Sequence, residues 1–581
     1  MTLDGLTLNV IVNEIKEPVL GCKVDKVHQP QPDTIVLSLR APGRSPKLLI
    51  SAGAFDSRLH LTEQKYPNPP SPPMFCMFLR KHLTGAKIVS IEQTGLERIV
   101  RLSMEAKDEL GLPRTLTLIA ELMGKYSNVI LINEQNVVMD SMRHVSSAQS
   151  RVRSVLPGLI YEEPLSSKLN PFTISRATLA EMLGKRGKTK LKSYLSQFLQ
   201  GISGPTADEL LWRYMPEGYE EHPREAERMA DVIRGFFNEL ETPRPTLYNR
   251  DGAPFFYAPV PFHSVQAQSA ENFGSANDMI DAYYFRLRLI GALARKRESL
   301  GRLTQKHIEK LSQTLQKQLE SLEQSKKADR HKMLGDIITA NIYRISRGQS
   351  KLVAQDYDTG EDVLVELDTR LSPAANAQQH YKRYNKLKSG LDITARRMAD
   401  TQKELGFLES VLVSLDSCET MDELFEVEYE LARAGYAPRT KEAPQKSTQE
   451  PSRPHRFISS DGMVILAGKN NRQNDLLTMK TAEQDDIWLH TKDIPGAHVL
   501  ITGAKGQPPE TTLLEAAGIA AYLSKAKNGG KVAVDYAPRK NIRKPNGARP
   551  GMVVYENYKT ILVPASRDTF ERLIVSVSDK P

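Results

Sequence analysis

The segment Leu391–Leu415, which reads LDITARRMADTQKELGFLESVLVSL, repeats an apolar residue at every seventh position. Heptad repeats of this kind are typical of helices that pack along a coiled-coil seam. Further apolar residues near the end of the segment fall at the d position of the same heptads. The pattern predicts one long helix from about Asn376 to Leu415, with a seam formed by Leu391, Met398, Leu405, Leu408, Leu412 and Leu415.

A second polar and strongly helical segment precedes it, from about Ala282 to Lys332. Its own short seam is marked by Ile308, Leu311, Leu315 and Leu322. Strand-forming residues occupy Asn341–Leu367 between the two segments, which predicts an antiparallel coiled-coil hairpin with a small domain at its tip. At about 1.5 Å per residue, such a hairpin suits contact with a large partner better than enclosure of a small substrate. An intramolecular strut or a homodimer stalk is the alternative.

The remaining chain predicts a multidomain α+β protein. Between two helical runs, the turn Gln200–Ala207 (QGISGPTA) resembles a helix-hairpin-helix turn, whose glycines let backbone amides approach a phosphate; a turn that only packs helices is the alternative. The capping box Thr420–Glu423 predicts the start of another helix.

The predicted segments are an N-terminal domain (1–168) with a helical insertion (169–243) and a return segment (244–281), the first coiled-coil helix (282–332), a tip domain (333–375), the second coiled-coil helix with the helix that follows (376–435), a flexible linker (436–456) and a C-terminal α/β domain (457–581).

Composition narrows the classes of function. The 581 residues are enough for roughly three or four domains, and 79 basic against 70 acidic residues give a net charge of +9, which mildly favours nucleic-acid partners. Three widely spaced cysteines predict no disulfide or zinc site and fit a reducing cytoplasm. We expect no signal peptide and no membrane span. The common nucleotide, protease, hydrolase and dinucleotide motifs do not occur, so we expect neither a cofactor nor a self-contained enzyme.

Polar residues and one of the two tryptophans are concentrated in Gly468–Val499. Within it, Asp486, Trp488 and His490 alternate with apolar residues and share one side of a predicted strand. Trp488 on an exposed face suits stacking against a base or anchoring a partner, whereas a second packing face covered by a helix is the alternative. His490 and His498 could join Asp486 at a metal, but hydrogen bonds between carboxylate and imidazole fit the spacing better.

The strongest cluster of positive charge is Arg539–Arg549, which reads RKNIRKPNGAR and contains no acid. Proline and glycine predict a loop or irregular strand, where cations can follow a phosphate backbone without reading sequence. A solvated loop is the alternative. The candidate phosphate-binding residues are Arg539, Lys540, Arg543, Lys544 and Arg549.

Five motifs in order along the chain resemble the RqcH/NEMF family, also called NFACT or fibronectin-binding-protein-A-like, in its bacterial RqcH form. They are LDGL from Leu3, FCMFLRKHL from Phe75, ELMGKYSN from Glu121, NAQQHYKRYNKLK from Asn376, and QND…DIWLH…IPGAHV in the last domain. The resemblance implies a ribosome quality-control factor that binds a large ribosomal subunit obstructed by peptidyl-tRNA. It implies recruitment of tRNA, mainly alanyl, and template-free alanine tailing that marks the stalled chain for degradation. Peptide bonds would form in the ribosomal peptidyl-transferase centre, with this chain holding tRNA in place.

The resemblance also implies roles for individual residues. It implies an N-terminal domain with the fold of formamidopyrimidine-type DNA glycosylases, although Thr2 stands where those enzymes carry their nucleophilic proline. The family contacts tRNA through an Asp-Arg pair, matched here by Glu97 and Arg98, and the longer acid alters the geometry of that contact. A second tRNA motif is matched by Glu121, Leu122 and Met123.

Contacts away from the N-terminal domain follow from the same resemblance. The hairpin tip is expected to reach the base of the ribosomal stalk, which consists of rRNA and protein. The C-terminal domain is expected to bind RNA through the basic cluster and the Asp486–His498 region. Two other functions stay open: a fibronectin-binding surface adhesin, which would require export, and a ribosome- or RNA-binding scaffold without tailing activity.

Overall fold

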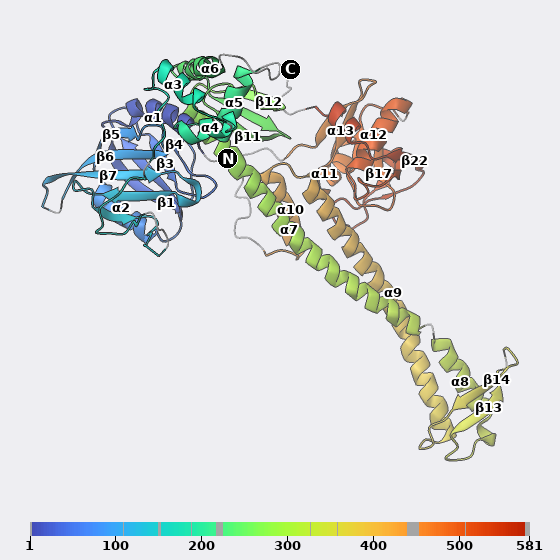
Figure 1. The fold of residues 1–581 in the computed structure, drawn as a ribbon. Coiled ribbons are helices and arrows are strands. Elements are labelled where there is room, and N and C mark those ends of the chain that lie inside the picture. The colour runs from blue at the N-terminus through green and yellow to red at the C-terminus, as the bar shows by residue number, and fades with distance from the viewer. Residues whose placement is uncertain are drawn as a thin grey trace. The chain divides into compact units, whose positions relative to one another are not determined.

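The computed structural model describes residues 3–108, 110–148, 153–164, 166–187, 189–215, 225–325, 327–356, 358–438, 452–505 and 507–575. The chain divides into two compact units, Met1–Ile290 and Gly291–Pro581. Figure 1 shows the helices and strands of both units as a ribbon.

A nine-stranded antiparallel sheet forms the framework of the first unit, in the order β4-β3-β2-β1-β5-β6-β7-β8-β9. Side chains alternate between its faces, so one face packs a large apolar core and the other carries a smaller cluster around Ile119 and Ile130. The strands are β1 (Lys23–Gln31), β2 (Thr34–Arg40), β3 (Lys47–Ser51), β4 (Arg58–Leu61), β5 (Lys87–Gln93), β6 (Ile99–Lys107), β7 (Pro113–Glu121), β8 (Asn128–Ile132) and β9 (Val138–Ser141).

Helices α1 (Gly5–Val19) and α2 (Met74–Leu83) pack into the large core of this unit. Glu14 of α1 also accepts hydrogen bonds from the backbone N–H groups of Ala276 and Asn277, at 2.7 and 3.0 Å. These two residues open helix α7 (Ala276–Ser325), whose free N–H groups need such an acceptor. A carboxylate 262 positions earlier in the chain therefore caps the start of this helix.

The helical segment after Leu169 shares the same core, to which Leu179, Leu195 and Phe236 contribute. The chain then returns to strands, which form a separate three-stranded sheet in the order β11-β10-β12. The elements are α3 (Arg176–Gly184), α4 (Leu191–Phe198), α5 (Gly204–Tyr214), α6 (Glu225–Glu239), β10 (Thr246–Arg250), β11 (Ala253–Ala258) and β12 (Ser269–Asn272).

Two long helices form the predicted hairpin of the second unit. Helix α7 continues into this unit, and α9 (Pro373–Ser417) returns after a small domain. Leu300 of α7 joins a buried cluster with Phe407 and Leu408 of α9, and Leu424 of α10 (Met421–Arg433) completes it. The multidomain α+β class with a long helical hairpin is confirmed.

The domain at the tip packs helix α8 (Ala328–Ala340) and a two-stranded sheet, β13 (Lys351–Gln355) and β14 (Asp362–Glu366), against the beginning of α9. The first long helix begins at Ala276, earlier than the predicted residue 282, because Ser275 Oγ accepts from the Asp278 N–H at 3.0 Å and Glu14 accepts from the two N–H groups before it. Most of the predicted linker 436–456 lies outside the described residues, and β15 (His455–Ile458) already begins within its last two positions.

The last part of the second unit is built on a six-stranded antiparallel sheet, in the order β15-β16-β18-β17-β19-β22. Helices α12 (Glu510–Tyr522) and α13 (Arg567–Leu573) pack on one face. Helix α11 (Asn471–Leu476) and the π-helical turn Leu477–Thr481 lie on the other face, beside a short ladder of two strands. The strands are β16 (Val464–Ala467), β17 (Ile487–Thr491), β18 (Val499–Ile501), β19 (Lys531–Pro538), β20 (Ile542–Arg543), β21 (Val554–Tyr555) and β22 (Lys559–Pro564).

Among the described residues, no helix combines the length and the apolar character needed to cross a lipid bilayer.

Candidate functional site

The predicted pair Glu97 and Arg98 lies in the turn between β5 and β6. Gln93 holds this turn against α1, because its Nε2 donates to the carbonyl oxygens of Gly5 (2.9 Å) and Glu97 (2.8 Å). The approach requires glycine at position 5, since a Cβ there would lie 2.0 Å from the Leu96 carbonyl oxygen. The turn is thereby fixed on the first residues of the first helix.

The two side chains of the pair have different surroundings. Glu97 Oε1 accepts a hydrogen bond from Ser166 Oγ at 2.6 Å. Arg98 contributes its backbone carbonyl to the Leu122 N–H at 2.8 Å. No residue in the described ranges bonds to the partly exposed Arg98 guanidinium. Arg98 can therefore donate to an external acceptor, whereas Glu97 already has a partner within the chain.

The glycine-containing turn before α5 packs beside the same site. Asp4 Oδ1 accepts from the Thr7 N–H at 2.8 Å, and its Oδ2 accepts from the hydroxyls of Ser203 (3.1 Å) and Thr206 (3.3 Å). Gly201 lies against Leu6, at a distance that leaves no room for a side chain. Asp4 and Leu6 therefore pack against this turn, and the packing alternative is the one observed.

Glu121 ends β7 and is buried, with 1% of its surface exposed. The Tyr161 hydroxyl donates to its Oε1 at 2.8 Å, and Arg153 forms an ion pair with its Oε2. Burial and the adjacent Glu121 carboxylate raise the pKa of Tyr161. Leu122 is fully buried in the core, while Met123 is partly exposed. Glu121 and Leu122 thus fix the end of the strand, and Met123 is the accessible member of the motif.

Three accessible side chains near this motif were missed by the sequence prediction. Phe55 and Tyr126 are 88% and 71% exposed, and Lys125 Nζ lies 4.9 Å from the centre of the Tyr126 ring. The two segments are neighbours, because a Cβ added at Gly124 would lie 3.4 Å from the Ala54 carbonyl oxygen. Exposed aromatic rings beside cations suit RNA bases and phosphates. The letters KY within ELMGKYSN were the available signal.

Trp488 is completely buried, so the covered-face alternative is the one observed. Its ring packs 5.0 Å from Tyr555 and 5.2 Å from His498, in a cluster with Leu477 and Leu500. Alternation along β17 places it correctly on the side opposite Ile487, but helix α11 and the turn after it cover that side. Stacking of Trp488 against an external base is therefore incompatible with this packing.

Of the neighbouring candidates, Asp486 and His498 are buried and His490 is partly exposed. Burial lowers the pKa of His490 to about 4 and that of His498 well below its ordinary value. The Thr478 hydroxyl lies 2.7 Å from His498 Nδ1. Asp486 accepts from the backbone N–H groups of Glu483 (2.9 Å) and Gly503 (2.8 Å). Asp486 and His498 therefore stabilise the domain from inside, and no three His, Cys, Asp or Glu side chains of the described residues are arranged to hold a metal.

All five candidate cations of Arg539–Arg549 are bonded within the chain. The bonds join Arg539 to the carbonyl oxygens of Thr478 and Ile542, Lys540 to Asp485, Arg543 to Glu556, Lys544 to Asp475, and Arg549 to Glu404. The Lys540 and Arg543 side chains are 56% and 67% exposed, and ion pairs at such exposure exchange readily. Those two are the accessible members of the cluster.

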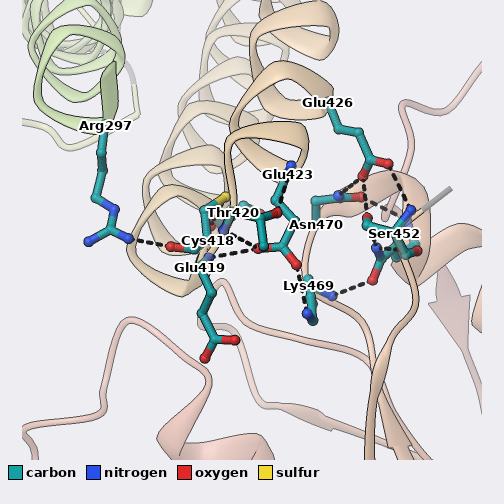
Figure 2. A network of polar contacts seen from close by, with 11 residues as sticks. Arg297, Cys418, Glu419, Thr420, Glu423, Glu426, Ser452, Lys469 and Asn470 are labelled. Carbon is teal, nitrogen blue, oxygen red and sulfur yellow. Dashed lines mark hydrogen bonds and ion pairs between the residues drawn. The ribbon is translucent and has the colours of Figure 1, made fainter. Parts of the chain in front are cut away.

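A polar network joins the C-terminal domain to α10 (Figure 2). Lys469 Nζ lies 2.6 Å from Glu423 Oε1, and Asn470 Nδ2 donates to Glu426 at 2.7 Å. Glu423 also accepts from the backbone N–H groups of Glu419 and Thr420, completing the predicted capping box. Burial raises the pKa of Glu423, but these bonds lower it further, and the net pKa lies below its ordinary value.

Comparison with known proteins adds independent information. Residues 4–450 match the family model for NFACT N-terminal and middle domains, and residues 453–557 match the NFACT protein RNA binding domain. The chain is 33% identical to the Rqc2 homolog RqcH of Bacillus subtilis (strain 168), over 99% of this chain and 100% of that protein. The RqcH of Streptococcus suis (strain 05ZYH33) is equally similar, at 33% over 99% of this chain and 100% of its own length.

A shorter match reaches a human protein, the ribosome quality control complex subunit NEMF. It is 30% identical and covers 24% of this chain and 12% of that protein. The two family models together span nearly the whole chain, in the order of the motifs identified in the sequence. The chain therefore belongs to the RqcH/NEMF family of NFACT proteins, and among them to the bacterial RqcH type.

Proposed function

We propose that the chain acts in ribosome quality control, by binding large ribosomal subunits obstructed by peptidyl-tRNA and recruiting tRNA to them. The observation that carries this proposal is the 33% identity to RqcH over nearly the full length of both chains. The match to an NFACT RNA binding domain supports an RNA partner. The human relative is named as a subunit of a ribosome quality control complex, which supports the same process.

The product of this activity would be a C-terminal alanine tail on the stalled nascent chain, added without a template and leading to degradation. Peptide-bond formation would take place in the peptidyl-transferase centre of the ribosome. The chain would hold the tRNA in position, because holding a reactant in the right geometry removes much of the entropic cost of a bimolecular step. On this proposal it is a tRNA-positioning factor that works in the cytoplasm.

The tRNA contact is assigned to Arg98 together with the exposed residues around it. Its guanidinium has no partner among the described residues and presents several donors in a fixed plane, which suits a base edge or a phosphate. Met123 and Tyr126 would add contacts to the bases. Glu97 and Glu121 would act indirectly, through their bonds to Ser166 and Arg153, by fixing the two ends of the β-strands that carry the site.

Other parts of the chain would contact the ribosome. The tip domain presents Tyr343, which is 82% exposed, and it is assigned to the base of the stalk. The C-terminal domain would bind rRNA through Lys540 and Arg543. Nothing in the fold favours the alternative of a fibronectin-binding adhesin.

The test is recovery of the tagged full-length protein from cells, followed by sequencing of the bound RNA and of the C-termini of the bound peptides. We expect large-subunit rRNA, alanine-accepting tRNA and alanine-extended peptides. Arg98→Ala should lose the tRNA and the tails while retaining the subunits. A matched control is Arg250→Ala, which removes an arginine bonded to the Gln266 carbonyl oxygen in the three-stranded sheet.

The alternatives give different results in this experiment. Subunits without extended peptides would support a scaffold lacking tailing activity. Recovery without ribosomal RNA would refute the proposal. Equal loss of tRNA and subunits in Arg98→Ala would refute the assignment of tRNA recruitment to this residue.

A further inference from the structure

Three cations stand in one row across neighbouring strands of the first unit. In the β1–β2 pair, Lys23 lies directly opposite Arg40, and in the β1–β5 pair it lies directly opposite Lys87. All three side chains are exposed. Their neighbours Val24 and Leu39 point into the core, so alternation along the strands places the cations on the outer face of the sheet.

This arrangement is unfavourable for the isolated chain. Like charges directly opposite each other on an antiparallel pair repel, because their side chains are adjacent. Glu105 of β6 is opposite Lys87 in the next pair, yet no ion pair links any of the three cations to an acid of the described residues. The basic cluster Arg539–Arg549 behaves differently, since its five cations are all bonded within the chain.

An open depression of about 770 Å³ lies over the Lys23–Arg40 end of the row. The turn Ala41–Arg44 forms its rim and is closed by two backbone hydrogen bonds of 3.0 and 3.1 Å. Gly43 has φ 75°, as the third residue of a type II turn requires. Arg44 donates to the carbonyl oxygens of Glu17 (2.8 Å) and Leu20 (2.7 Å), which orient its guanidinium without neutralising its charge.

We propose that Lys23, Arg40 and Lys87 form a binding site for the phosphate backbone of RNA, and that the RNA is the tRNA whose recruitment is proposed above. This inference rests on that proposed function. A phosphate between opposed cations removes their repulsion, and contacts of this kind position RNA without reading its sequence. Strand β5 runs from Lys87 to the turn that carries Arg98. Its six residue steps, at about 3.3 Å each, place Lys87 about 20 Å from Gln93, where that turn begins.

The test compares two full-length triple variants that remove the same charge. K23Q/R40Q/K87Q neutralises the row, and R176Q/K185Q/K192Q neutralises three exposed cations of the same unit that are paired with Asp231, Glu181 and Asp208. One arm measures binding of a tRNA transcript between 50 and 200 mM KCl. The second arm measures binding to purified large subunits without tRNA.

We expect the row variant to bind tRNA at least tenfold more weakly at the lowest salt, with a salt-dependence slope flatter by about 2. The control variant should change the tRNA affinity less than threefold, and subunit binding should be equal for both. The row variant should also have a melting temperature equal to or above that of the original chain, because repulsion is removed. An unchanged or higher melting temperature shows that the variant is folded, so a loss of tRNA binding is not caused by unfolding.

Each other outcome has a defined meaning. A row variant indistinguishable from the control in both arms overturns the site, and an effect confined to the subunit arm overturns its assignment to tRNA. Arg98→Ala, measured in parallel, separates the two proposals. If Arg98→Ala weakens tRNA binding and the row variant does not, the proposed function stands and this inference fails.

Discussion

Replacing Lys469 by methionine tests the contact between the C-terminal domain and α10. The change keeps an unbranched apolar stem and removes the ammonium group that lies 2.6 Å from Glu423 Oε1. The two side chains are only 12% and 2% exposed. Loss of one partner of a buried ion pair costs about 3–5 kcal/mol. Because Glu423 keeps its two backbone N–H bonds, we expect the lower end, about 3 kcal/mol.

The assay is urea unfolding of the full-length protein. Unfolding is monitored by the fluorescence of a probe attached to the C-terminal domain. Lys527→Met is the matched control, since Lys527 pairs with Asp416 on α9 at 3.1 Å with both side chains well exposed. An exposed pair contributes at most about 1 kcal/mol. The free energy of unfolding should therefore fall clearly in the first variant and little in the second.

The pH dependence provides a second check. The lowered pKa of Glu423 means that its contribution is present at neutral pH and is lost as the pH falls through the folded-state pKa. Without Lys469, burial favours the protonated form of Glu423, because a neutral carboxyl costs less to bury than a carboxylate. The deficit of Lys469→Met should be largest near pH 7 and shrink towards pH 4. Equal effects of the two variants, or a deficit that does not change with pH, would refute the reasoning.

Three further predictions follow from other side chains. Burial raises the pKa of Glu430 to about 7, so the unfolded chain loses this proton at a lower pH than the folded chain does; the melting temperature should fall between about pH 4.5 and 7, level off above pH 7, and change less in Glu430→Gln. Arg98→Ala should weaken binding of a tRNA transcript at least tenfold without lowering the melting temperature, because nothing in the described chain bonds to its guanidinium. Charge reversal of Lys540 and Arg543 should weaken binding to large subunits and flatten its salt dependence, with unchanged tRNA affinity.

The hairpin was predictable because the apolar repeat that forms a coiled-coil seam occurs within one continuous segment of the sequence. Repeats such as Leu408 and Leu415 specify a helix and one apolar side, and both residues are buried as expected. The start of the first long helix has a local signal that the prediction missed, because Ser275 Oγ accepts from the Asp278 N–H at 3.0 Å as an N-cap. The second acceptor, Glu14, lies 262 positions away, and a contact at that separation leaves no local signal.

The candidate site was predictable only in part, for a similar reason. Alternation assigned Trp488 to the correct side of its strand, but period-two patterning does not say whether another element covers that side. The cluster Arg539–Arg549 contains no acid, yet its partners Asp475, Glu404 and Glu556 come from elsewhere in the chain. The opposed cations were missed because Lys23, Arg40 and Lys87 become neighbours only through strand register.

The contacts of the first helix have a consequence for synthesis of the protein. Helix α1 is buried among residues that come much later, and its Asp4 and Glu14 side chains bond to Ser203 and Ala276. A bacterial ribosome adds about 5–20 residues per second, so roughly 15 to 55 s separate the emergence of α1 from that of its last partner. Strands β4 and β5 pack against α1 and emerge early in that interval, so the sheet covers the helix first and the segments that carry Ser203 and Ala276 cover it last. We expect the nascent N-terminus to reach its full native contacts only when the start of α7 has emerged.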